Sequence, residues 1–136
     1  MAPGLIDARP IGEMMGTGTP VQSVTNFWTG SIWFLNMEEH KYDRQIPQGQ
    51  TLNVGSGWVP WCRWTEEFGT RHIAIVDANA GTVLFYIWQW RGDDGDFVRA
   101  SSNGFSKPGP HIAGQPEPGG ERNLLVNTNR VILSKP

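Results

Sequence analysis

The stretch TVLFYIWQW, residues 82–90, decides the fold class, because it is the most β-prone run in the chain. Nearly all of its residues are β-branched, aromatic or aliphatic, and the first two classes are enriched in strands. The preceding Asn79-Ala80-Gly81 is a turn sequence of the kind that joins hairpin strands. Alternation within the run places Val83, Phe85 and Ile87 on one face, so we expect Phe85 and Ile87 to lie in the central core.

Shorter segments of the same kind flank this run, at intervals of about 8–12 residues that are typical of sandwiches and barrels. No stretch of the chain has a convincing helical period, although Glu38–Tyr42 and Thr65–Phe68 are each suited to a single helical turn. We therefore predict an all-β, single-domain antiparallel β-sandwich, jelly-roll-like, or a small barrel. The expected strands lie within residues 21–28, 30–39, 51–54, 71–78, 97–101 and 123–135.

The chain has 136 residues, which suits one compact domain. Residues 1–20 hold three prolines and four glycines and have no period, so we expect an extended N-terminal arm, docked through Met14 and Met15. The β-sandwich domain should then span residues 21–136. Within it, residues 102–120 hold five glycines and four prolines and predict a long, irregular Gly/Pro-rich loop.

Charge and composition argue against several classes of function. The formal net charge is −2 and no basic stripe is visible, so nucleic-acid binding is not expected. No apolar run approaches the roughly 20 residues of a membrane span. No signal peptide is visible, so we expect a cytoplasmic protein, with non-classical secretion as an alternative. The single cysteine, Cys62, excludes an internal disulfide, and no cofactor fingerprint occurs, so we expect no cofactor.

A second apolar face is the unusual feature of the predicted strands. Tyr86, Trp88 and Trp90 lie opposite the core face of their strand, and Trp33 and Leu35 form a similar row in another. A one-sided sandwich strand would alternate apolar and polar residues. The arm and the long loop, a second subunit in a homo-oligomer, or a ligand must cover these rings. We expect cover by the chain itself, with a ligand-accessible gap at Trp88 and Trp90.

Three tryptophans spaced three apart, Trp58, Trp61 and Trp64, stand in a Gly/Pro-rich segment without period. Aromatic rings on such loops can stack on the apolar face of a sugar, while nearby polar side chains bind its hydroxyl groups. The alternative is a plug of tryptophans that closes one end of the barrel. Cys62 lies between two of the rings and is expected to be a small buried hydrophobe rather than a nucleophile.

Polar groups near the strongest strand are the candidate partners of a ligand. Asp93 and Asp94 lie in an acidic turn directly after it, and Asn103 opens the long loop. We expect this turn to be solvated rather than to bind calcium, since the EF-hand spacing is missing. The three histidines show no metal-binding spacing, so we predict no metal site; a spatial cluster of Glu38, His40 and His72 stays possible.

These features favour a lectin-like, carbohydrate-binding module over an enzyme, with a carbohydrate or another small hydroxylated, partly apolar molecule as its ligand. The first alternative is a small cofactor-free enzyme, an isomerase, cyclase or hydratase with an aromatic-lined pocket. Its acid and base would come from His72, Glu38, His40 or Asp77. The second is a structural or toxin-like assembly protein. The predicted ligand-binding residues are Trp58, Trp61, Trp64, Trp88, Trp90, Asp93, Asp94 and Asn103.

Overall fold

The computed structural model describes residues 18–38, 41–106 and 109–136, and these form ten strands and one short 3₁₀ helix. The N-terminal residues up to 17, with Met14 and Met15, and His40 lie outside the described residues. The elements are β1 (Pro20–Asn26), β2 (Ile32–Asn36), β3 (Lys41–Ile46), β4 (Thr51–Trp58), η1 (Thr65–Thr70), β5 (Ile73–Asp77), β6 (Val83–Gly92), β7 (Gly95–Ser101), β8 (Ala113–Gly114), β9 (Arg122–Val126) and β10 (Val131–Ser134).

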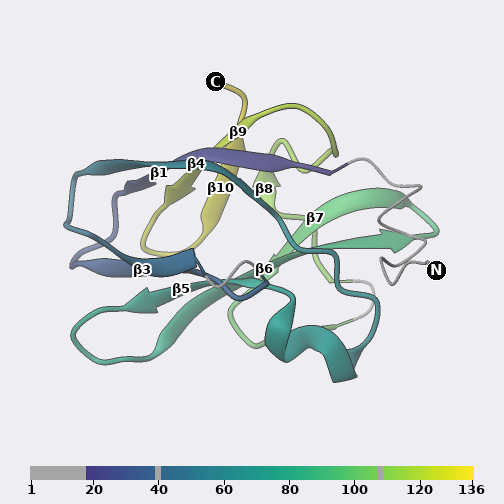
Figure 1. Cartoon of the computed structure of the whole chain (residues 1–136), viewed down its shortest axis with the longest axis horizontal. Coiled ribbons are helices and arrows are strands. Elements are labelled where there is room, and N and C mark those ends of the chain that lie inside the picture. The colour runs from purple at the N-terminus through teal and green to yellow at the C-terminus, as the bar shows by residue number, and fades with distance from the viewer. Residues whose placement is uncertain (1–17, 39–40, 107–108) are drawn as a thin grey trace.

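The strands form two five-stranded sheets, in the orders β4-β1-β9-β10-β8 and β3-β2-β5-β6-β7. Figure 1 shows them as two layers, with η1 at the lower right. The predicted all-β sandwich is confirmed. Every pair in the sheet of β6 is antiparallel, whereas β1 with β9 and β8 with β10 are parallel pairs in the other sheet. The turn after Asn26 therefore carries the chain from one sheet to the other rather than closing a hairpin.

The core between the sheets uses one face of each long strand. Phe85 and Ile87 of β6 are buried in it, as the alternation predicts, together with Ile73 and Ile75 of the neighbouring β5. The opposite sheet contributes Val21, Val24, Leu124, Val126, Val131 and Leu133.

The second face of β6 is covered by the chain itself. The ring of Trp88 meets Phe68 of η1 edge-on at 5.4 Å between centroids, and Phe105 of the long loop at 5.5 Å. Gly109 completes the cover, since a Cβ there would overlap the Trp88 ring. Trp88 is fully buried, so the expected ligand-accessible gap beside it is wrong. Trp90, near the end of the strand, stays partly exposed, as do Trp33 and Leu35.

Two of the local predictions have different outcomes. The helical turn expected at Thr65–Phe68 is η1, but Lys41 and Tyr42, expected in the other turn, begin β3 instead. The long loop is tied down at several points: Ala100 donates its backbone N–H to Pro110, and Gln115 donates to Leu133. None of the described residues forms a helix that is both long enough and apolar enough to cross a membrane.

Candidate functional site

The three tryptophans of the Gly/Pro-rich segment do not form one platform. Trp61 is buried, because its backbone bridges to Gln89 of β6 and draws the segment against that strand. Backbone hydrogen bonds on both sides hold it there: Cys62 donates to the carbonyl of Gln89, and Gln89 donates to that of Pro60. Trp58 and Trp64 are 51% and 43% exposed. The prediction of a ligand-binding role for Trp61 therefore conflicts with its burial.

Trp64 is an exposed ring held in a fixed position. It stands directly before η1 in an extended conformation, and its carbonyl oxygen accepts hydrogen bonds from Glu67 N at 3.2 Å and from the Cys62 thiol at 3.4 Å. The Arg63 guanidinium lies over the indole, 4.2 Å from the ring centroid. Such cation–π contacts orient a ring at modest energetic gain.

The guanidinium of Arg63 is in turn fixed by Glu67. Its Nε and Nη2 donate to the two carboxylate oxygens at 3.3 and 3.0 Å, and the backbone N–H of Arg63 donates to Oε1 at 2.7 Å. This bidentate geometry restricts both side chains. One face of the Trp64 indole is therefore occupied by a clamped cation.

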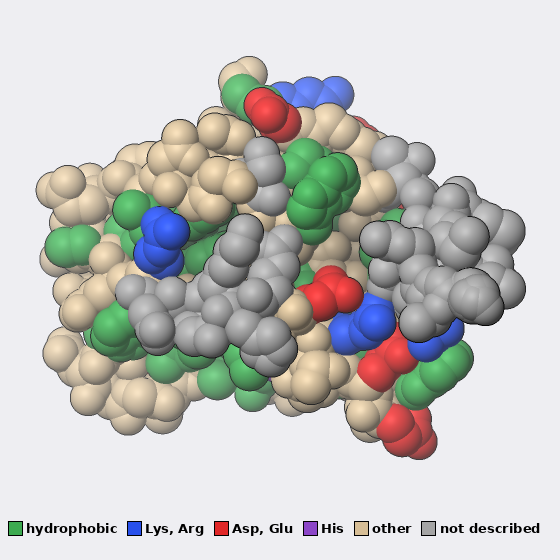
Figure 2. Space-filling view, viewed as in Figure 1, with side chains coloured by type: hydrophobic (Ala, Val, Ile, Leu, Met, Phe, Trp, Pro, Cys, Tyr) green, Lys and Arg blue, Asp and Glu red, His purple; other side chains and the backbone are tan. Residues whose placement is uncertain are grey.

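Charged groups surround this ring. Arg71 forms an ion pair with Glu38 at 3.4 Å and also donates to the carbonyl of Trp61. In the space-filling view, acidic and basic side chains lie next to one another at the lower right, over η1, beside hydrophobic surface (Figure 2). The region thus combines an exposed aromatic ring with hydrogen-bond donors and acceptors. We call Arg63, Trp64 and Glu67 the Trp64 platform.

Trp58 ends β4, and its ring packs across the backbone of Gly18, where a Cβ would approach it to 2.6 Å. The glycine allows this close approach of ring and chain. Trp58 and Trp64 thus rest on different supports.

The acidic turn between β6 and β7 is paired rather than simply solvated. Asp94 accepts hydrogen bonds from Arg99 at 2.9 and 3.2 Å and from His111 Nε2 at 2.8 Å. These bonds, that of Arg99 first, hold the pKa of Asp94 well below its usual range. Asp96 accepts two hydrogen bonds from Arg91. Asp93 and Asn103 are exposed.

His72 is buried, although the start of a strand suggested a surface position. Its ring stacks on Phe68 at 4.6 Å between centroids, and its Nδ1–H donates to the carbonyl of Phe68 at 2.6 Å. Desolvation lowers the pKa of His72, and the hydrogen bond to Phe68 opposes this shift in part. Cys62 is buried as expected.

The remaining acid–base candidates have other partners. Glu38 pairs with Arg71, and Asp77, at the far end of β5 from His72, accepts a hydrogen bond from the backbone of Asn79. No group of three or more potential metal ligands occurs within the described residues, and His40 lies outside them.

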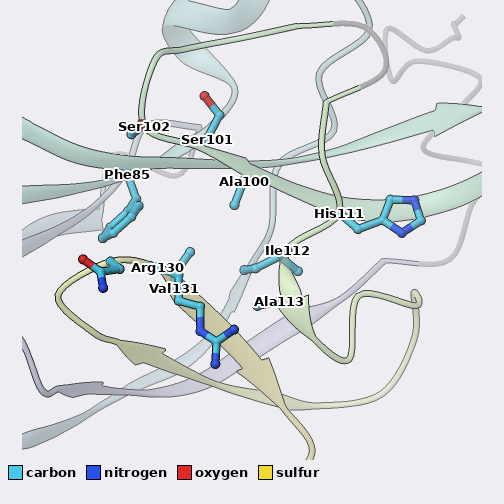
Figure 3. A pocket seen from close by; sticks show the side chains of 10 residues that line it. Phe85, Ala100, Ser101, Ser102, His111, Ile112, Ala113, Arg130 and Val131 are labelled. Carbon is cyan, nitrogen blue, oxygen red and sulfur yellow. The ribbon is translucent and has the colours of Figure 1, made fainter.

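A pocket of about 220 Å³ opens between the two sheets at the edge where β7 and β8 lie. Its floor is apolar, with Phe85, Ala100, Ile112 and Val131, and its rim is polar (Figure 3). Sequence reasoning missed this pocket, because its walls come from separate segments and carry no shared motif. The rim residues include Ser102, His111, Asn129 and Arg130.

No family model, curated protein or solved structure matches this chain, so the arrangement of its side chains is the basis for assigning a function.

Proposed function

We propose that the protein is a carbohydrate-binding module that stacks a sugar ring on Trp64. The observation that carries this proposal is the preorganisation of the platform: a large aromatic ring, 43% exposed, is held by a guanidinium that is itself clamped by a carboxylate. An exposed ring of this size costs free energy in water, and fixing it in advance reduces the entropy lost on binding.

The chemistry around the ring suits a hydroxylated ligand. The apolar face of a sugar would cover the open face of the indole, opposite Arg63. Glu67 and Arg63 would then offer hydrogen bonds to hydroxyl groups at the edge of the ring. Trp58, Trp90, Asp93 and Asn103 stay candidate contacts, whereas the burial of Trp61 and Trp88 argues against both.

The enzyme hypothesis is supported more weakly. His72 has the lowered pKa that such a site would use, but its ring is only 7% exposed and packs flat on Phe68. A homo-oligomer, a cytoplasmic location and the toxin-like or structural role stay predictions.

A glycan array followed by titration of tryptophan fluorescence tests the proposal. The intact chain should retain a glycan, and Trp64→Ala should weaken binding by roughly tenfold, as expected for losing more than about 1 kcal/mol of aromatic contact. Trp64→Phe, which keeps a ring, should lose less.

Phe27→Ala is the matched control, because Phe27 is a 55% exposed aromatic side chain on the turn between β1 and β2. It should bind like the unmodified protein. An array without any retained glycan, or equal affinity for Trp64→Ala and the unmodified protein, would contradict carbohydrate binding at this ring.

A further inference from the structure

The pocket between the sheets is built like a binding site for an amphiphile. Its floor is made by apolar side chains from both sheets: Phe85 of β6 and Ala100 of β7 on one side, Val131 of β10 on the other. Ile112, just before β8, closes it between them. An apolar group of ligand placed there would be removed from water on several sides, which is the main source of affinity in such pockets.

The charge at this pocket lies at its mouth. Arg130 is the one arginine or lysine among the residues that line it, and no lining residue is acidic. Figure 3 shows the Arg130 side chain running away from the floor formed by Phe85 and Ile112. Arg130 is exposed, and no ion pair joins it to another part of the chain that the structure describes.

The other polar side chains of the rim are neutral or already engaged. His111 donates its Nε2–H to Asp94, and the hydroxyl of Ser101 donates to the carbonyl of Gly104. Figure 3 shows Ser102 and His111 at opposite ends of the pocket, so they do not form the nucleophile–base pair of a hydrolase. The geometry therefore favours binding rather than catalysis.

We propose that this pocket binds a small carboxylate with an apolar tail, the tail between the sheets and the carboxylate on Arg130. A single guanidinium matches one carboxylate through two parallel hydrogen bonds. A phosphate would bring more negative charge than one arginine offsets. The volume of about 220 Å³ suits a short acyl chain rather than a long fatty acid. This site is separate from the Trp64 platform and does not depend on sugar binding.

A titration of the full chain followed by ¹H–¹⁵N NMR tests the proposal with hexanoate as the probe. Hexanoate at millimolar concentration should shift the amide signals of Ser102, Ile112 and Val131. Hexanamide has the same tail without the charge, and acetate has the charge without the tail. Both should bind at least about tenfold more weakly, as should inorganic phosphate.

Arg130→Gln should reduce hexanoate affinity to that of hexanamide, and Arg44→Gln, which removes an exposed arginine on β3, should leave it unchanged. Both substitutions are at exposed positions, so both variants should fold. The proposal is overturned if hexanoate shifts no signals of the pocket, if hexanamide or acetate binds equally well, or if Arg130→Gln binds hexanoate like the unmodified protein.

Discussion

Arg99 is a cation that is 1% exposed, on the face of β7 opposite the core. Removing an ion from water costs several kcal/mol, and partners must offset this cost. Asp94 binds the guanidinium through both oxygens, and the carbonyl of Gly109 accepts a further hydrogen bond at 3.1 Å. This one side chain therefore joins the acidic turn to the long loop, which is why the turn does not behave as a free hairpin tip.

Asp94→Asn should lower the thermal midpoint by several degrees at pH 7, because it removes the countercharge of a buried arginine. The folded-state pKa of Asp94 is lowered, so its stabilising effect is full above the ordinary pKa of about 4 and decreases as the pH falls below it. Thermal melts at pH 7 and pH 3 should therefore show a smaller difference between the two proteins in acid. Asp93→Asn, an exposed neighbour in the same turn, is the control and should melt like the unmodified protein.

His72 predicts a pH dependence of its own. Because burial lowers its folded-state pKa, the unfolded chain takes up a proton more readily, and stability decreases as the pH falls below the ordinary value of about 6.5. Urea melts should show less stability at pH 5.5 than at pH 7.5. His72→Phe keeps an aromatic ring beside Phe68 and should lack this decrease; an unchanged decrease in that variant would assign it to another group.

At the scale of elements, β6 is central because both of its faces are covered. One face enters the core through Phe85 and Ile87, and the other lies under η1 and Phe105. Antiparallel strands normally keep one face in water. The near-continuous apolar run of β6 follows from this double cover.

Ile87→Ala should lower the free energy of unfolding by about 2–5 kcal/mol, because it removes buried methyl groups and leaves a cavity. The urea midpoint measures this loss. Thr82→Ala, at an exposed position just before the same strand, should change the midpoint little. A midpoint for Ile87→Ala close to that of the control would show that this face does not carry the core.

At the scale of the whole molecule, segments far apart in sequence close the second face of one sheet. Residues 65–70 and the loop around Phe105 and Gly109 meet over Trp88. Gly109 is needed there, because the backbone passes so near the indole that a Cβ would overlap Trp88 Cζ2.

Gly109→Ala should therefore destabilise the protein by about 1–3 kcal/mol, the usual cost of forcing extra volume into a packed site. It should also raise tryptophan fluorescence accessibility to a quencher, as the loop lifts from Trp88. Gly69→Ala is the control, since a Cβ at Gly69 meets nothing within 4 Å. Equal stability of the two variants would show that the loop adapts without strain.

The sequence by itself determined the all-β class, the core face of β6 and the short helix at 65–70, because strand alternation and local turn chemistry are properties of neighbouring residues. It also marked Trp88 as a ring that needed a cover. Only the tertiary structure decided what that cover is, which tryptophans stay exposed, and that Asp94 pairs with Arg99 and His111. The parallel pairing of β1 with β9 and the pocket near Arg130 belong to the same group. Each of these depends on contacts between distant segments, and periodicity carries no information about which segments meet.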